Sequence, residues 1–249
     1  MKNLNIGSCQ FRKDGWINLD KPSAHYNNRQ EKIDINYDLN SHNEIPISDE
    51  DLTSAYTSHT IEHIPDSSVE YLFKEVHRML RIGGVFRITC PDIGRCYDAY
   101  MQNDIEYISG WLANPKGWKR FRSMGIGEQF LFIFASYLSP YLANTGFVRK
   151  YDEDEINNIF KTKTKEAALS YFTEECQRTA GHLQKSTPGN HISWWDFEKL
   201  KEKLQVIGFN NITKQEYNKS TFSFLEGFDC LSEANVSQSD YTLFIECIK

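Results

Sequence analysis

Acidic side chains and one glycine stand at the ends of successive apolar runs, and they carry the clearest chemistry in the chain. Gly7, Asp20 and Asp38 each come at the end of such a run. In an open α/β sheet the ligand lies beyond the carboxyl ends of the strands, so these three groups can converge on one ligand. A glycine lets the backbone approach that ligand closely, and carboxylates accept hydrogen bonds from hydroxyl and amine groups. The order of these residues therefore predicts a pocket for a nucleotide-like molecule.

A second group of reactive side chains lies at residues 59–63, with the sequence His-Thr-Ile-Glu-His. This spacing matches a pattern in which two histidines on one helix face bind zinc and the glutamate acts as general base. A zinc site of that kind needs a helix throughout and a third ligand. Here the pattern follows an apolar strand directly, and Pro65 comes two residues after His63. We therefore expect these residues to bridge a strand end and a short helix.

Three further groups are candidates for contact with a substrate. Asp92 ends the fifth apolar run, and His191 precedes the last predicted helix. Residues 116–122 interleave four cations with two aromatic side chains. That pattern is typical of an amphipathic helix with a solvated basic face, and recognition of a phosphate or sugar is the alternative.

The elements that must position these residues alternate between short strands and one clear helix. The apolar spacing predicts a helix that begins with a capping box of Ser67 and Glu70 and stops at Gly83. Its apolar stripe comprises Val69, Leu72, Phe73, Val76 and Leu80. The β-branched and aromatic residues 85–90 then predict a buried strand. Strand, helix and strand in this order imply a right-handed crossover and parallel pairing.

The pattern changes between residues 94 and 190, where long helical stretches replace the short strands, and we interpret this region as a helical insertion. Its most apolar segment, residues 130–138, is far shorter than the roughly 20 residues of a membrane-spanning helix, so we expect a core helix, a lid or a subunit contact. Ser193 is then predicted to cap a helix that includes Trp194 and ends at Gly208. Residues 209–217 and 241–248 are predicted to form two closing strands.

Four short phrases carry a resemblance to a known family. They lie at residues 15–20 (Gly-Trp-Ile-Asn-Leu-Asp), 58–63 (Ser-His-Thr-Ile-Glu-His), 78–84 (Arg-Met-Leu-Arg-Ile-Gly-Gly) and 91–92 (Pro-Asp). Together with the order of strands, they resemble the class I S-adenosylmethionine-dependent methyltransferases, and more narrowly a group of small bacterial methyltransferases. The resemblance implies an α/β fold with a Rossmann-like, mostly parallel seven-stranded sheet whose last strand is antiparallel.

The same resemblance implies a division of the chain and a set of contacts to the methyl donor. Residues 1–93 and 191–249 would form the cofactor-binding domain, and residues 94–190 the helical insertion that serves as lid and acceptor-binding element. The residues expected to contact S-adenosylmethionine are Ile6, Gly7, Ser8, Cys9, Asp20, Asp38, Leu39, Ser58, His59 and His63. The turn at Gly7 would pass under the methionine part, Asp20 would accept hydrogen bonds from the ribose hydroxyls, and Asp38 would receive the adenine amine.

The implied reaction is methyl transfer from S-adenosylmethionine to a small-molecule or glycan-like acceptor by in-line displacement. The donor carries an activated methyl group, so the protein mainly aligns the reactants and excludes water. A hydroxyl acceptor would need a general base, for which we expect His59, Asp92 or His191, in that order; no metal is required. Two alternatives stay open. One is a zinc hydrolase that uses His59, Glu62 and His63, and the other is a non-catalytic module that binds S-adenosylmethionine.

Composition and charge narrow the expected partners and location. The formal net charge of −6 gives no general attraction to nucleic acid. The amino terminus lacks the apolar stretch of a secretory signal, so we expect a cytoplasmic protein without a membrane span. A homodimer formed through the insertion is a further hypothesis. The six cysteines show no metal-ligand spacing and are expected to be reduced; Cys9 stands where the family turn usually has a second glycine.

Overall fold

The computed structural model describes residues 2–8, 14–23, 33–112, 115–142 and 146–249. The chain forms two compact units, of which the first comprises Met1–Cys90 and Phe197–Lys249 and the second Pro91–Asp196. The predicted insertion, residues 94–190, lies within the second unit. Within the described ranges, no helix combines the length and the apolar character that crossing a membrane requires.

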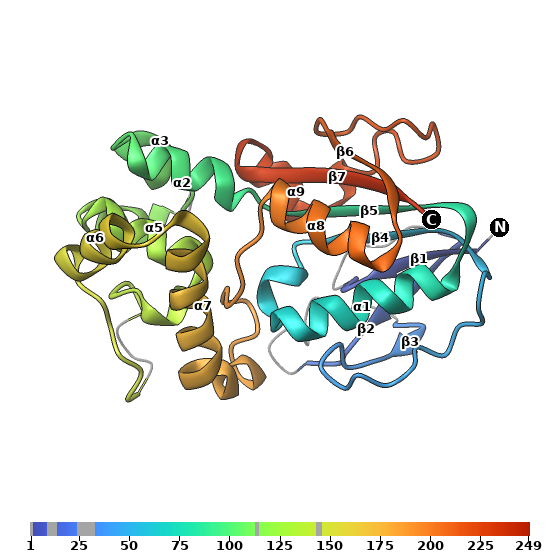
Figure 1. The fold of residues 1–249 in the computed structure, drawn as a ribbon, viewed down its shortest axis with the longest axis horizontal. Helices are drawn as coiled ribbons and strands as arrows, with labels where there is room; N and C mark the ends of the chain where they lie inside the picture. Colours follow the sequence, from blue (N-terminus) through green and yellow to red (C-terminus); the bar gives the residue numbers. More distant parts are fainter. Residues whose placement is uncertain (1, 9–13, 24–32, 113–114, 143–145) are drawn as a thin grey trace. The chain divides into compact units, whose positions relative to one another are not determined.

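One seven-stranded sheet forms the centre of the first unit, with the strand order β3-β2-β1-β4-β5-β7-β6 (Figure 1). The strands are β1 (Lys2–Ile6), β2 (Trp16–Asp20), β3 (Ile35–Asn36), β4 (Leu52–Ser58), β5 (Leu80–Pro91), β6 (Asn210–Gln215) and β7 (Thr242–Ile248). Parallel pairing joins β3 to β2, β2 to β1, β1 to β4 and β4 to β5, whereas β6 and β7 pair antiparallel. The predicted Rossmann-like, mostly parallel sheet with an antiparallel end is therefore confirmed.

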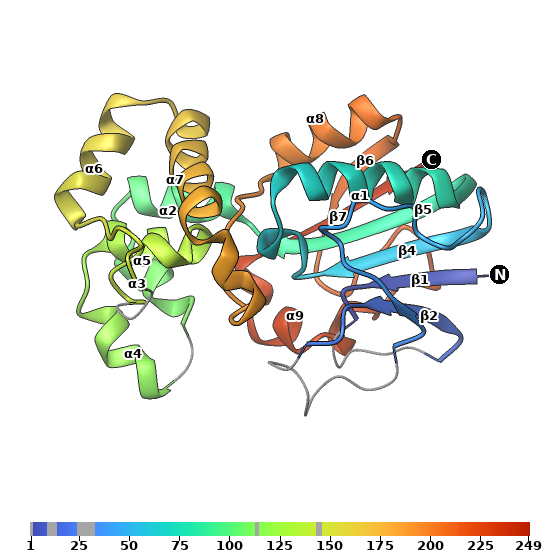
Figure 2. The same ribbon diagram turned by 90° about the horizontal axis from the view of Figure 1, so that it is seen from below.

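Different elements cover the two faces of this sheet. Helices α1 (Asp66–Met79) and α8 (Phe197–Ile207) lie on one face, and α9 (Glu233–Ser237) lies on the other (Figure 2). Alternation along β5 serves both faces: Phe86 packs on Phe73 of α1 with ring centroids 5.6 Å apart, whereas its neighbour Val85 joins a buried cluster with Phe228. The segment between β6 and β7, which carries η5 (Asp229–Leu231), α9 and η6 (Ser239–Tyr241), thus covers one face of the sheet.

The predicted start and end of α1 need correction. Its predicted stripe is buried, but the N-cap is Pro65 and no side chain caps the helix. Ser67 falls inside the first turn, because the Pro65 carbonyl already accepts the first helical hydrogen bonds. The helix ends at Met79 rather than at Gly83, since β5 begins at Leu80. Gly83, with φ of +76°, lies in the irregular start of that strand, where the register with β4 shifts.

The prediction that Ser193 caps the last long helix is wrong, because α8 begins only at Phe197. Trp194, which was predicted in its apolar stripe, lies in the second unit together with Trp195. Trp194 Nε1 lies 3.3 Å from Ser170 Oγ, and the Trp195 carbonyl accepts the Ile93 amide at 3.1 Å. The predicted end is confirmed, since Gly208, with φ of +117°, follows the last helical residue Ile207.

Helices dominate the second unit. They are α2 (Ile93–Met101), α3 (Ile105–Gly110), α4 (Pro115–Arg122), α5 (Ile126–Phe134), η3 (Ser136–Leu138), α6 (Glu153–Thr162), α7 (Lys165–Ala180) and η4 (Gly181–Lys185). The apolar segment 130–138 spans most of α5 together with η3, and its Phe130 and Phe134 are fully buried. Most of this segment therefore belongs to the core of the helical unit.

A carboxylate at the start of α5 explains the two glycines there. Glu153 accepts the backbone N–H groups of Gly127 at 3.1 Å and Glu128 at 3.0 Å, which satisfies amides that the helix itself leaves unbonded. A Cβ on Gly125 would lie only 2.1 Å from the Glu153 carboxylate. The glycine at 125 thus makes room for the acid that caps the helix.

Candidate methyl-donor site

The turn after β1 is held by a hydrogen bond to β2 on one side and lies against Thr60 on the other. Gly7 donates its N–H to the Leu19 carbonyl of β2 at 2.9 Å and has φ of +66°. A Cβ at this position would lie 2.3 Å from Thr60 Oγ1, a distance that no real side chain tolerates. Glycine is therefore required here by Thr60 as well as by the backbone angle. Ser8, the next residue, is buried, and Cys9 lies outside the described residues.

Of the two predicted acids, Asp20 ends its strand as predicted, whereas Asp38 lies in the turn two residues beyond the end of β3 and not at a strand end. Asp20 is the last residue of β2 and pairs in register with Asn36 of β3. The Tyr37 amide then donates to the Asp20 carbonyl at 3.0 Å, so that Asp38 follows directly on this contact. Both carboxylates engage the same residue: Asp20 Oδ1 accepts the backbone N–H of Lys21 at 2.7 Å, and Asp38 Oδ2 lies 2.5 Å from Lys21 Nζ.

The surroundings of Asp38 keep it ionised. Burial alone would raise the pKa of this carboxyl, but the Lys21 ammonium and the backbone amide of Asn40 outweigh burial and lower the pKa below its ordinary value. The Asn40 amide lies 3.0 Å from Asp38 Oδ1. Leu39, between them, is half-buried. At neutral pH the Asp38 carboxylate is thus a hydrogen-bond acceptor in the turn after β3, next to the end of β2.

At the end of β4, Ser58 belongs to a polar network rather than to an open surface. Its Oγ lies 2.9 Å from Ser232 Oγ and 3.0 Å from the Thr89 hydroxyl of β5. The Thr89 hydroxyl also lies 3.0 Å from Asn235 Oδ1 on α9. The carboxyl ends of β4 and β5 are thereby tied to the segment between β6 and β7.

His59 departs from ordinary strand geometry, since its φ of +45° lies in the left-handed region. Its Nε2 lies 3.1 Å from Thr242 Oγ1, and that hydroxyl donates to the Gln238 carbonyl at 2.8 Å, so Nε2 is the donor in this pair. On the other side, Nδ1 lies 3.2 Å from Glu62 Oε1. Both ring nitrogens of His59 are thus engaged inside the first unit.

Residues 59–63 do not form the continuous helix that the zinc-binding pattern requires. Only Ile61–His63 is helical, as a single 3-10 turn η2, and His59 lies outside it. The two histidines therefore cannot share the face of an α-helix, as that alternative requires. Instead, Glu62 lies between them, with its Oε1 at 3.2 Å from His59 Nδ1 and 3.8 Å from His63 Nε2. As expected, the residues bridge a strand end and a short helix.

Two predicted base candidates lie in the second unit. Asp92 caps α2, accepting the Arg95 amide at 3.0 Å. His191 Nδ1 lies 2.5 Å from the Ile133 carbonyl, which can only accept, so Nδ1 carries the proton. In neutral His191, Nε2 is then the basic nitrogen.

The predicted basic helix α4 uses two of its arginines within the same unit. Arg120 donates to the Pro140 carbonyl at 3.1 Å and lies over the Tyr141 ring, and Arg122 pairs with Glu106.

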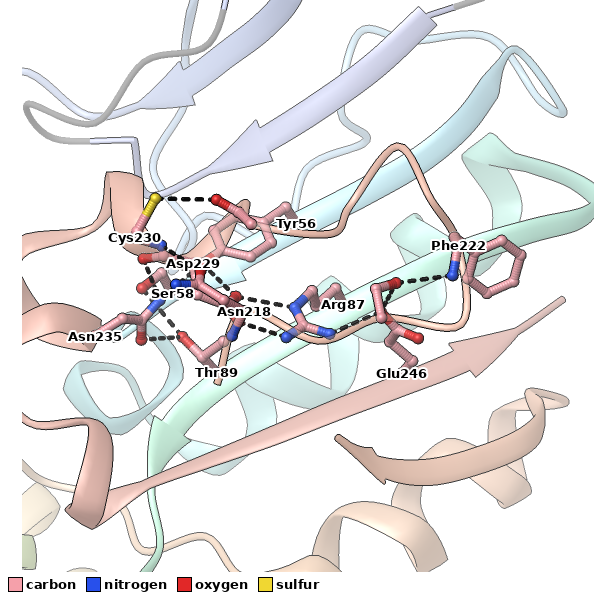
Figure 3. Close-up of polar contacts among 12 residues, drawn as sticks. Tyr56, Ser58, Arg87, Thr89, Asn218, Phe222, Asp229, Cys230, Asn235 and Glu246 are labelled. Atoms are coloured by element: carbon pink, nitrogen blue, oxygen red, sulfur yellow. Dashed lines mark hydrogen bonds and ion pairs between the residues drawn. The ribbon is translucent and has the colours of Figure 1, made fainter. Parts of the chain in front are cut away.

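Sequence reasoning missed a buried ion network beside the polar network of β4 and β5. Arg87 of β5 is fully buried and bonds to Asp229 through Nε, at 2.9 Å, and Nη2, at 2.5 Å (Figure 3). Its Nη1 donates to Glu246 Oε1 of β7 at 2.7 Å. Burial lowers the pKa of Arg87, but the two carboxylates raise it above its ordinary value. The sequence could have indicated this network, because Arg87 is a cation within an apolar run, and a cation in a buried strand must be paired.

That network anchors the cover of the sheet. Asp229 also accepts the Asn218 backbone amide at 2.9 Å, and Glu246 Oε2 accepts the Thr221 hydroxyl at 2.8 Å. Asp229 opens η5, which leads into α9 and its contacts with Ser58 and Thr89. The charge of Arg87 is thus used to hold the segment that closes over the ends of β4 and β5.

Comparison with known proteins gives a family match over part of the chain. Residues 17–88 match the family described as "Methyltransferase domain", a range that runs from β2 into β5. No curated protein matches the chain in sequence.

Solved structures with similar folds include several methyltransferases. A SAM-dependent methyltransferase from Archaeoglobus fulgidus is 12% identical, with a TM-score of 0.42 over 100% of this chain and 86% of the other. An S-adenosylmethionine-dependent methyltransferase from Mesorhizobium loti is 13% identical, with a TM-score of 0.44 over 100% and 90%. Phosphoethanolamine N-methyltransferase 2 of Haemonchus contortus, solved with S-adenosyl-L-methionine, is 12% identical, with a TM-score of 0.39 over 100% and 48%.

The matched range contains most of the parallel strands β2 and β5 and all of β4. Residues 17–88 are thus similar to a methyltransferase domain, and they lie on a sheet that is mostly parallel with an antiparallel end, as the resemblance implied.

Proposed function

We propose that this chain is a methyltransferase that binds S-adenosylmethionine at the edge formed by the ends of β1, β2 and β3, and that it transfers the methyl group to a small-molecule or glycan-like acceptor. The observation that carries the binding site is the pairing of Asp20 and Asp38 through Lys21 beside the Gly7 turn. Two carboxylates, one at the end of β2 and one in the turn after β3, suit the two ribose hydroxyls and the amine of an adenosine group.

The residues present fit such a donor. Asp20, at the carboxyl end of β2, would accept the ribose hydroxyls, and the ionised Asp38 would accept the adenine amine. Gly7, held between Leu19 and Thr60, would present a backbone without a side chain to the methionine part. Bound S-adenosylmethionine supplies a methyl group activated by a sulfonium, so the residues around it need to orient it and exclude water rather than activate it.

A hydroxyl acceptor would need a general base, and His59, Asp92 and His191 stay the candidates for that role. Replacing the base by Asn should lower kcat by about 10²-fold or more and leave donor affinity unchanged.

Calorimetry with S-adenosylmethionine tests the donor site. We expect binding by the wild type and a loss of about tenfold or more in affinity for both Asp20→Asn and Asp38→Asn, because each removes a charge-assisted hydrogen bond. Asp51→Asn is a matched control, since Asp51 pairs with Lys2 at the other end of the strands. Equal affinity in all four proteins would refute this site, and binding without turnover of any acceptor class would favour a non-catalytic binding module.

A further inference from the structure

One lysine engages both predicted donor-binding carboxylates. The backbone N–H of Lys21 donates to Asp20 Oδ1 at 2.7 Å, and its ammonium lies 2.5 Å from Asp38 Oδ2. Lys21 directly follows the last residue of β2, so the strand itself directs this residue to the edge where the acids lie.

The ammonium of Lys21 and an adenine amine would both seek the same acceptor. Asp38 already uses Oδ1 for the Asn40 amide and Oδ2 for Lys21. A carboxylate offers about four lone-pair positions. The Lys21 ammonium at 2.5 Å nevertheless fills the space next to Oδ2 and partly neutralises its charge. An incoming amine would therefore have to displace the Lys21 head group from that oxygen.

The exposure of the pair makes such displacement easy. The Lys21 side chain is 58% exposed and that of Asp38 37% exposed, so water and salt screen the attraction between them. An exposed ion pair of this kind contributes so little free energy that breaking it would lower the affinity for a ligand by a factor of roughly 2 to 5 at most. The pair is thus weak enough to yield to a ligand and strong enough to change its affinity measurably.

We propose that Lys21 is an internal competitor for Asp38, and that donor binding requires its ammonium to leave that carboxylate. This inference rests on the proposed function, because it assigns Asp38 to the amine of the donor. The affinity for S-adenosylmethionine then depends on how much more strongly Asp38 interacts with the adenine amine than with the Lys21 ammonium. Removal of the lysine head group raises this affinity.

Calorimetry with the full chain and its Lys21→Met variant tests this competition. We expect Lys21→Met to bind S-adenosylmethionine roughly 2 to 5 times more tightly than the wild type. Raising the salt concentration from about 0.1 M to about 1 M should strengthen wild-type binding relative to that of the variant, because salt weakens the internal pair. Lys2→Met is the matched control: Lys2 Nζ lies 2.5 Å from Asp51 and is also 58% exposed, but Lys2 begins β1.

S-adenosylhomocysteine separates competition from simple charge repulsion. This ligand has the same adenosine group but lacks the sulfonium charge, so competition at Asp38 predicts the same gain for both ligands. Repulsion between Lys21 and the donor charge predicts a gain for S-adenosylmethionine alone, and that result would overturn the proposal. In an Asp38→Asn background the gain from Lys21→Met should vanish, since the contested carboxylate is gone.

Binding by the wild type and by Lys21→Met distinguishes failure of the competition from failure of the donor site. Unchanged or weaker binding by Lys21→Met, in a chain whose wild type binds the donor, overturns the competition and leaves the donor site standing. Absence of donor binding by the wild type overturns the proposed site, and the competition with it.

Discussion

The buried Arg87 network makes a large and specific prediction about stability. Arg87 and Asp229 are fully buried, and the Glu246 side chain is 2% exposed. Replacing Arg87 by Met keeps much of the volume but leaves two carboxylates in the core without their cation. Removing one partner of a buried ion pair costs about 3–5 kcal/mol of unfolding free energy. For a chain of this size, about 2–4 °C of melting temperature is lost per kcal/mol, so the expected fall is roughly 6–20 °C.

Thermal and urea unfolding of Arg87→Met against the wild type measure this loss. Lys203→Met is the control, because its pair with Glu70 is exposed by 35% and 38% and contributes at most about 1 kcal/mol. Adding Asp229→Asn and Glu246→Gln to Arg87→Met should recover part of the stability, since the orphaned charges are then gone. A loss of under about 1 kcal/mol for Arg87→Met would refute the argument that this cation anchors the segment between β6 and β7.

Three further outcomes are expected. Gly7→Ala should destabilise the chain by about 1–3 kcal/mol more than Gly15→Ala in urea unfolding, because both glycines have positive φ but only Gly7 faces Thr60; equal losses would remove the steric argument. Glu153→Ala should lower the stability of the helical unit by about 1–2 kcal/mol in thermal unfolding, since it caps α5, and an unchanged melting temperature would contradict that role. Burial, with Lys249 nearby, lowers the pKa of His77 below 6.5, so its contribution to stability is present above pH 6.5 and is lost as the pH falls through the folded-state pKa. His77→Gln should therefore make the urea midpoint depend less on pH between about pH 7.5 and pH 5. An unaltered pH profile would exclude His77 as the source of that dependence.

The strand ends could be predicted from the sequence because each is marked by its own residues. Asp20 and Ser58 end β2 and β4 as predicted, since an apolar run there gives way at once to polar residues. Asp38 was placed at a strand end, but β3 stops at Asn36, and the acid lies in the turn that follows.

Contacts between distant segments could not be predicted in the same way. Arg87 signals its need for a partner, but Asp229 is 142 residues away and no local pattern selects it over other acids. The start of α8 was misplaced because Trp194 continues the apolar helical spacing of the residues that follow, whereas tertiary contacts hold it in the second unit. No local pattern marks Lys21 as a partner of the two acids, since a lysine after a strand is ordinarily solvated. Packing over long separations, rather than local preference, decided each of these cases.

The most direct test of the donor site is a structure of the chain crystallised with S-adenosylhomocysteine. The account predicts the ribose hydroxyls within hydrogen-bond distance of the Asp20 carboxylate, the adenine amine at Asp38 and the Lys21 ammonium withdrawn from it. A ligand bound at another edge of the sheet, with the Lys21 and Asp38 pair intact, would contradict it.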